Sequence, residues 1–242
     1  MKGVVLSAGL GKRLKPITET IPKPLIEIAD GKTCLDIVID SLQKVVDEIV
    51  IVVGYLGEKI KEYLSNKNFA IKVKVIKNPY YASEGNLTSL LTARPFIEKE
   101  EFILTNADHL FPSDFYTDYF KFEEGVIVAG QRKESREILE DEMKIRVDKN
   151  GNLKDISKTL KDYDGAYIGV TYVSNSALRD YWEAVNRIIN KTDSNTICVE
   201  DVLRELIKEE KYPRVQWLDE VIWFEIDTIE DLKRAREGVK KW

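Results

Sequence analysis

A glycine-rich turn follows an apolar run at the start of the chain, and this pairing constrains the fold more than any other feature. The run Gly3-Val4-Val5-Leu6 predicts a buried strand, and the segment Ser7–Leu14 (SAGLGKRL) predicts a tight turn after it. Gly9 and Gly11 have no side chains, so backbone N–H groups in the turn can approach an anion closely. The sequence therefore predicts an α/β protein with a phosphate site at the end of its first strand.

Two cations lie close to this turn in the sequence. Arg13 belongs to it, and Lys23 follows in Pro22-Lys23-Pro24-Leu25. The Walker motif does not explain the pattern, because Arg13 stands where that motif has Ser or Thr. The dinucleotide-binding motif fails as well, because Leu14 stands where its third glycine would be. Backbone donors with two positive charges suit a triphosphate, and a plain turn with solvated basic residues is the alternative.

Strand and helix patterns alternate through the first half of the chain. Runs of β-branched residues bounded by turn residues predict strands, and apolar residues three and four positions apart predict helices. The expected strands are Lys2–Leu6, Glu48–Val53, Ile71–Ile76 and Phe102–Thr105, and the expected helices are Thr33–Val46, Gly57–Leu64 and Asn86–Ile97. Such alternation predicts an α/β fold with a mixed, mainly parallel central sheet and helices on both faces.

The second half combines short strands with helices. Asn150-Gly151 signals a hairpin turn, and Thr228, three residues before Asp231, predicts the N-cap of a closing helix. The expected strands are Val126–Gly130, Met143–Val147, Leu153–Ser157, Ala166–Val173 and Val221–Ile226, and the expected helices are Asn175–Asn190, Val199–Glu209 and Ile229–Lys240. No linker or repeat divides the sequence, so we expect one domain over residues 1–242.

Composition and charge narrow the range of partners. The 242 residues carry a formal net charge of -5, and this acidic balance argues against nucleic acid, which calls for a basic face. No apolar stretch approaches the roughly 20 residues that span a bilayer, and no signal peptide is expected. Cys34 and Cys198 predict buried thiols in a reducing compartment. We expect a cytoplasmic protein without membrane insertion, and the sequence is compatible with a homodimer.

Two aspartates each follow a predicted strand. Asp108 comes in Asn106-Ala107-Asp108-His109, and Asp227 comes directly after Ile226, whereas Glu225 reads as an ordinary alternating strand position. Ligands of open α/β sheets bind at the carboxyl ends of strands, which is where each aspartate is expected, although the sequence alone cannot bring the two together. Two such carboxylates can share one Mg²⁺, which completes its coordination with phosphate oxygens and water. Loop capping for Asp108, and a helix N-terminal charge for Asp227, are the alternatives.

The segment Ala8–Pro16, together with Pro22-Lys23-Pro24, resembles the signature of the nucleotidyltransferases that act on sugar phosphates and related alcohol phosphates. The family pattern is A-A-G-x-G-[TS]-R-L-x-P with P-K-P, and the chain departs from it at Ser7 and Lys12. The resemblance covers nearly the whole chain and implies the nucleotide-diphospho-sugar transferase fold. It implies that an acceptor phosphate attacks the α-phosphorus of a nucleoside triphosphate and releases pyrophosphate. Residues 1–110 would mainly bind the nucleotide, and residues 111–242 mainly the acceptor.

The resemblance also assigns roles to residues. Arg13 and Lys23 would be catalytic, and Asp108 and Asp227 would hold the magnesium ion. The loop before the helix at Asn86 contacts the nucleobase in the family, and Asn86 can cap that helix as well. The residues expected to bind the nucleotide are Leu6, Ser7, Ala8, Gly9, Gly11, Lys12, Arg13, Lys23, Gly85, Asn86, Thr88, Ser89 and Asp108.

The acceptor site is less clearly marked. Lys158 can bind a phosphate, although a single lysine on a charged surface is usually solvated. His109, the only histidine, is expected to be a polar wall residue near the site, because no Ser or Cys nucleophile is paired with it. The residues expected to bind the acceptor are Lys144, Lys158, Asp164, Gly165 and Glu200.

Within the family, the Gly85-Asn86 loop and the Asn106-Ala107-Asp108 segment resemble those of cytidylyltransferases. This implies CTP as donor and a small alcohol phosphate, inositol 1-phosphate, as acceptor. Phosphocholine is a first alternative, although a quaternary ammonium calls for an aromatic cage that the dispersed aromatic residues do not reveal. Uridylyl or thymidylyl transfer to a hexose 1-phosphate is a second. A catalytically silent nucleotide-binding subunit is a third, but it should have lost the cations or the carboxylates.

Overall fold

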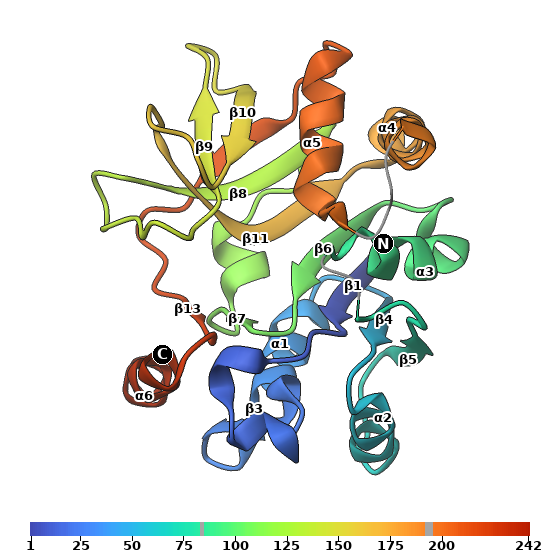
Figure 1. Ribbon diagram of the computed structural model, residues 1–242, viewed down its shortest axis with the longest axis vertical. Coiled ribbons are helices and arrows are strands. Elements are labelled where there is room, and N and C mark those ends of the chain that lie inside the picture. Colours follow the sequence, from blue (N-terminus) through green and yellow to red (C-terminus); the bar gives the residue numbers. More distant parts are fainter. Residues whose placement is uncertain (83–84, 192–195) are drawn as a thin grey trace.

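The computed structural model describes residues 1–82, 85–191 and 196–242. Within these residues, nine strands form one mixed sheet (Figure 1). The strands are β1 (Lys2–Ser7), β4 (Glu48–Val53), β5 (Lys72–Lys77), β6 (Phe102–Asn106), β8 (Val126–Arg132), β9 (Lys144–Val147), β10 (Leu153–Ser157), β11 (Gly165–Val173) and β12 (Arg214–Trp217). The parallel strands β5, β4, β1 and β6 lie side by side, and β11 joins β6 antiparallel. The predicted mixed α/β sheet is confirmed.

The C-terminal strands extend the sheet from β11. β8 runs antiparallel along β11, β12 lies parallel to β8, and the β9–β10 hairpin joins the start of β11. Gly151 takes a φ of +82° in the hairpin turn, so the turn predicted at Asn150-Gly151 is confirmed. β12 was not predicted from the sequence, because its four residues are too few to show a period.

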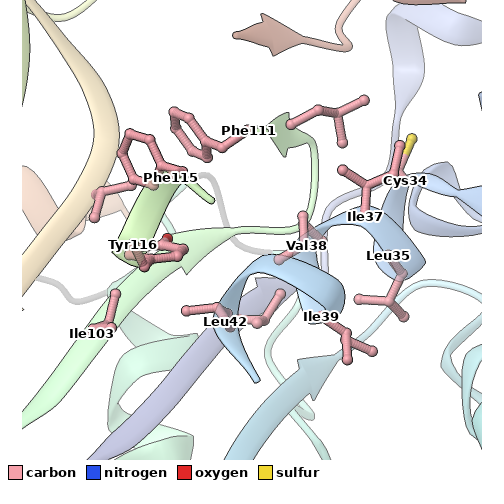
Figure 2. Packing of buried hydrophobic residues seen from close by; sticks show 14 of the residues in the cluster. Cys34, Leu35, Ile37, Val38, Ile39, Leu42, Ile103, Phe111, Phe115 and Tyr116 are labelled. Atoms are coloured by element: carbon pink, nitrogen blue, oxygen red, sulfur yellow. The ribbon is translucent and has the colours of Figure 1, made fainter. Parts of the chain in front are cut away.

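Helices cover both faces of the sheet, as predicted. Successive strand residues point to opposite faces, so Val5 joins one core cluster while Val4 and Leu6 join the other. One cluster includes residues of α1 (Cys34–Leu42), α2 (Gly57–Ser65) and α6 (Ile229–Gly238), and the other includes residues of α3 (Leu87–Ile97), α4 (Leu178–Lys191) and α5 (Val199–Lys208). Figure 2 shows the apolar side chains of α1 near Ile103 of β6 and the ring of Phe111.

Two small sheets lie outside the main one. β2 (Glu27–Ala29) pairs with β3 (Lys32–Thr33), and β7 (His109–Leu110) pairs with β13 (Phe224–Glu225). The strand predicted over Val221–Ile226 is therefore wrong in length, and it does not belong to the main sheet. The cap predicted at Thr228 is confirmed, since its hydroxyl accepts from the backbone N–H of Asp231. Within the described residues, no helix is both long and apolar enough to cross a membrane.

Gly165 lies where β11 touches the backbone of β8. A Cβ atom at this position would lie 2.1 Å from the carbonyl oxygen of Gln131, which cannot move without breaking the sheet. Gly165→Ala should lower the free energy of unfolding by about 3 kcal/mol, measured in urea. Gly3→Ala is the control, because its nearest new neighbour is the side chain of Ile49 at 3.3 Å. Equal stability of the two variants would contradict this packing.

Candidate active site

The glycine-rich turn and the first aspartate leave the sheet at the same edge. β1 and β6 are parallel neighbours, with Leu6 opposite Asn106. The backbone N–H of Ala107 donates to the carbonyl oxygen of Leu6 at 3.0 Å, which extends the pairing beyond the strand. Asp108 therefore emerges beside the turn that follows β1.

Gly11 gives the turn its shape. It takes a φ of +61°, a left-handed conformation that favours glycine, and its carbonyl oxygen accepts from the hydroxyl of Thr18 at 2.8 Å. A Cβ at Gly11 would lie 2.8 Å from the side chain of Thr18 and 3.5 Å from the Cβ of Lys23. The missing side chain lets the turn pack against the segment that carries Lys23.

Lys23 lies between two prolines in a short 3-10 helix, Lys23–Leu25, where Pro22 and Pro24 restrict the backbone. Its side chain is 11% exposed. Its Nζ donates to Oδ2 of Asp108 at 2.6 Å and to Oδ1 of Asp227 at 2.5 Å. The structure thus brings Lys23 and both predicted metal carboxylates to one point, which we call the charged corner.

Asp227 reaches the charged corner by a route that the sequence analysis did not predict. β13 pairs antiparallel with β7, with Glu225 opposite His109, and the N–H of Ile226 donates to the carbonyl oxygen of Asp108 at 3.0 Å. The aspartate was expected at the edge of the main sheet. Instead, the pairing of β13 with β7, in a separate two-stranded sheet, places Asp227 at the charged corner.

The charges at the corner stabilise one another. Burial alone would lower the pKa of Lys23, but Asp108 and Asp227 outweigh burial and raise it. Burial would likewise raise the pKa of Asp108, but Lys23 and His109 hold it below its usual value. Asp108 is therefore an anion at neutral pH, as a metal ligand must be.

The corner fits a magnesium ion in its donor chemistry. Asp108 and Asp227 share one partner, so their oxygens lie close together. Oδ1 of Asp108 is buried and has no hydrogen-bond partner among the residues that the structure describes. Nε2 of His109 lies 3.7 Å from this oxygen, beyond hydrogen-bond distance, so the oxygen can still coordinate a cation.

Arg13 lies at the exposed side of the corner, with 54% of its side chain accessible. Its guanidinium donates to Asp227 and, at 3.0 Å, to Oδ2 of Asp141. Asp141 belongs to residues 133–142, the connection between β8 and β9 that we call the flap. Arg13 is thus an accessible cation beside Lys23, where a polyphosphate can reach it.

His109 is buried next to Asp108. Its Nδ1 lies 3.0 Å from the carbonyl oxygen of Ile168, its Nε2 lies 3.5 Å from Oε1 of Glu225, and its ring stacks on Trp223 at 5.2 Å. Burial would lower the pKa of His109, but Glu225 and Asp108 raise it to about 9. The imidazole is therefore protonated at neutral pH and cannot act as a base there.

The residues predicted to bind the nucleotide fall into two groups at the turn. The side chains of Leu6, Ser7 and Ala8 are buried, so only their backbone can face a ligand, although Oγ of Ser7 has no hydrogen-bond partner among the described residues. Gly9 and Lys12 are exposed. The turn can thus offer a ligand its backbone groups and one further cation, the side chain of Lys12.

Thr88 and Ser89, in the first turn of α3, bond the residue Asn78 that follows β5. Both are buried, and both hydroxyls accept from Nδ2 of Asn78, at 3.1 and 3.0 Å. Oδ1 of Asn78 in turn accepts from the N–H of Tyr80 at 2.8 Å. Both hydroxyls thus bond the loop that carries Asn78, and the contacts of Thr88 and Ser89 with a base stay a prediction.

Gly85 and Asn86 join α3 to the start of α5. A Cβ at Gly85 would lie 2.0 Å from the carbonyl oxygen of Ile197, so the close backbone approach is to this carbonyl. The predicted cap of α3 by the side chain of Asn86 is wrong, because its Oδ1 accepts from the N–H of Val199 at 2.8 Å.

Three of the predicted acceptor residues, Lys144, Asp164 and Gly165, contact backbone groups of this chain. The buried ammonium of Lys144 donates to the carbonyl oxygens of Glu140 at 2.7 Å, Lys158 at 3.1 Å and Leu139 at 3.3 Å. Oδ2 of Asp164 accepts from the N–H of Val147 at 2.8 Å. Gly165 is needed for the contact with β8, as described above. The ammonium of Lys144 and Oδ2 of Asp164 are thus engaged with backbone groups in this structure.

Lys158 and Glu200 are better placed for a ligand. Lys158 is exposed, and Glu200 is buried at the start of α5. Burial raises the pKa of Glu200, and its charge interacts with Lys158 and His109. Glu200 thus lies within electrostatic reach of Lys158 and of His109, the residue after Asp108.

A cavity of about 890 Å³ adjoins the corner on the side of the flap. Arg13 and Asp227 belong to its wall, together with Arg136, Asp141 and Trp223. Neither Arg136 nor Asp141 was predicted as a site residue. A lone Arg or Asp in a charged connection carries no sequence signal, whereas the folded flap places both beside the reactive groups.

Comparison with known proteins agrees with this geometry. Residues 2–137 match the family model described as nucleotidyl transferase. The chain belongs to the nucleotidyl transferase family of enzymes.

Individual relatives are similar over the full chain. The bifunctional IPC transferase and DIPP synthase of Archaeoglobus fulgidus is 30% identical over 99% of this chain and 44% of that protein. The choline-phosphate cytidylyltransferase of Streptococcus pneumoniae is 28% identical over 99% of both. The structure of the inositol-1-phosphate CTP transferase from T. maritima has a TM-score of 0.80 over 99% of this chain and 96% of that one, at 22% identity, a likeness of fold. The chain spans about half the length of several curated relatives that it matches.

The protonation of His109 can be tested by NMR, because it is the only histidine. Its Cε1–H resonance should titrate near pH 9 rather than near 6.5. Because the pKa of His109 is raised in the folded state, the charged imidazole stabilises the folded protein fully below about pH 6.5. This stabilisation is lost as the pH rises through 9. Glu225→Gln should lower the midpoint, since Glu225 is the largest cause that raises it. A midpoint at or below 6.5 in the unsubstituted protein would contradict the described environment.

Proposed function

We propose that the protein transfers the CMP group of CTP to inositol 1-phosphate, giving CDP-inositol and pyrophosphate. The observation that carries the transfer chemistry is the charged corner, where Lys23 joins Asp108 and Asp227 beside Arg13. The choice of CTP is supported by the names of two similar proteins, a choline-phosphate cytidylyltransferase and an inositol-1-phosphate CTP transferase.

The proposed reaction needs no covalent intermediate. A phosphate oxygen of the acceptor attacks the α-phosphorus, the bond to the β-phosphate oxygen breaks, and pyrophosphate leaves. Arg13, exposed at the edge of the corner, would stabilise charge on the α-phosphate and the leaving pyrophosphate. Lys23, held deeper, would bring the donor and acceptor phosphates together. Catalysis then depends on positioning and on charge stabilisation.

We propose that Asp108 and Asp227 hold Mg²⁺. When bound, the ion would orient the α-phosphate and reduce repulsion between the two anionic substrates. The two carboxylates are ready for this role because Lys23 already keeps them together. The buried Oδ1 of Asp108, which lacks a hydrogen-bond partner within the described residues, supports the assignment.

The surroundings of the corner favour a hydroxylated acceptor over phosphocholine. A quaternary ammonium binds against aromatic faces. The aromatic residues in the cavity wall are Trp223 and Phe224, and both are engaged. The guanidinium of Arg136 already lies 5.6 Å from the ring centre of Trp223, and Phe224 packs on Trp242. The carboxylates of Glu200 and Glu225 instead suit the hydroxyl groups of a polyol.

Phosphocholine transfer is the second candidate, since its S. pneumoniae relative matches over 99% of both chains. The test is pyrophosphate release with CTP, UTP and dTTP, each combined with inositol 1-phosphate, phosphocholine or glucose 1-phosphate. We expect turnover with CTP and inositol 1-phosphate to exceed the other pairs by at least tenfold. Turnover of phosphocholine or glucose 1-phosphate without inositol 1-phosphate would overturn the acceptor. No release with any pair would favour a silent nucleotide-binding subunit.

The role of Lys23 predicts a large kinetic effect. Lys23→Met removes the cation shared by the two carboxylates, so pyrophosphate release should slow by roughly 10²–10³. Lys15→Met is the control, because Lys15 is exposed and its partner Glu19 lies 3.6 Å away on the surface. Circular dichroism would verify that both variants fold. Equal rates of the Lys23 and Lys15 variants would reject the mechanism.

A further inference from the structure

Gln131, at the end of β8, has every hydrogen-bonding position of its amide occupied. Its side chain is buried, and Nε2 donates to the carbonyl oxygens of Val221 at 2.7 Å and Leu218 at 2.9 Å. Oε1 accepts from Nε of Arg136 and from Nε1 of Trp223, both at 2.8 Å. Two donors and two acceptors are thus matched by four partners.

The four partners belong to the elements that build the charged corner. Leu218, Val221 and Trp223 lie in the segment that leads through β13 to Asp227. The ring of Trp223 stacks on His109, the residue after Asp108. One buried amide therefore connects to Asp227 along the chain from Trp223, and to Asp108 through Trp223 and His109.

Arg136 extends the connection to the flap. Its guanidinium donates to Oε1 of Glu142 at 2.9 Å and to Oε2 at 2.5 Å, a bidentate pair that closes the flap on itself. Asp141, next to Glu142, reaches Arg13 from this flap. The hydrogen bond between Gln131 and Arg136 thus helps to hold the flap, and with it Asp141, in place beside Arg13.

We propose that Gln131 is a positioning residue that sets the orientation of Trp223 and of the flap, and through them the relative placement of Asp108, Asp227 and Arg13. The inference rests on the proposed function, in which these three groups act on the phosphates. Gln131 itself need not touch a substrate. An apolar residue would remove all four bonds, and a glutamate would set a carboxylate against the carbonyl oxygens of Leu218 and Val221.

The chain offers a matched control in Gln216 of β12, the strand next to β8. Its Oε1 accepts from the N–H of Lys121 at 3.0 Å, and its Nε2 donates to the carbonyl oxygen of Tyr119 at 2.8 Å. Gln216 thus bridges backbone groups as Gln131 does, but none of its partners leads to the corner. Gln131→Met and Gln216→Met keep side-chain length and remove the amide in both cases.

The test compares these variants in two measurements. The first is the Cε1–H resonance of the single histidine at fixed pH, which reports the position of the Trp223 ring and needs no substrate. We expect Gln131→Met to move this resonance and Gln216→Met to leave it in place. The second is the rate of pyrophosphate release, which Gln131→Met should lower by about 10- to 100-fold and Gln216→Met by less than twofold.

Gln131→Glu serves as a second variant if Gln131→Met does not fold. It keeps the two bonds that Oε1 accepts from Arg136 and Trp223, so the histidine resonance and the rate should both stay near those of the unsubstituted protein. An unmoved resonance in Gln131→Met, or rates equal to those of Gln216→Met, would overturn the proposal. If the unsubstituted protein releases no pyrophosphate, the proposed function fails, and the resonance alone decides whether Gln131 positions Trp223.

Discussion

The site depends on one interaction, the contact of the Lys23 ammonium with Asp108 and Asp227. The two carboxylates come from distant parts of the chain and would repel each other without a shared cation. Because the Lys23 side chain is largely buried, solvent screens the contact less than it screens a surface ion pair. The same three charges that hold the turn, β7 and β13 together are those that the proposed reaction uses on phosphates.

Strand pairings and the flap place the charged residues around this contact. The parallel pairing of β1 with β6 delivers the glycine turn and Asp108 to one edge, and the pairing of β7 with β13 delivers Asp227. The flap then brings Asp141 to Arg13, the most exposed cation of the group. The buried Lys23 and the accessible Arg13 suit different roles, since Lys23 holds the two carboxylates together and Arg13, paired with Asp141 and Asp227 at the surface, can be reached by an incoming polyphosphate.

Much of the fold, and the core of the site, could be predicted from the sequence. The β-branched run Glu48–Val53 and the apolar spacing of α1 have periods that a short window reveals. Arg13, Lys23 and Asp108 follow motifs of fixed spacing. The meeting of Asp227 with Asp108 could be expected only from the family resemblance, because the two-residue strands β7 and β13 leave no period in the sequence.

The residues around the core of the site were harder to predict. Lys144 looked like an acceptor ligand because sequence does not separate a solvated lysine from one whose ammonium is bound to three carbonyl oxygens. The hydroxyls of Thr88 and Ser89 could bond a nucleobase, but in the folded chain both accept a hydrogen bond from Asn78, which the sequence does not indicate. Gln131 lies in a strand with no motif, and its importance arises only from where four partners converge in the folded chain.

The most direct test of the charged corner is a double-mutant cycle on Asp108→Asn and Asp227→Asn, measured as the rate of pyrophosphate release with CTP and inositol 1-phosphate. If the two carboxylates act as one unit with Lys23, each single variant loses roughly 10²–10³ in rate, and the double variant loses hardly more than either single one. Losses that multiply in the double variant, or a single variant with the rate of the unsubstituted protein, would show that the two carboxylates work independently and would contradict the account.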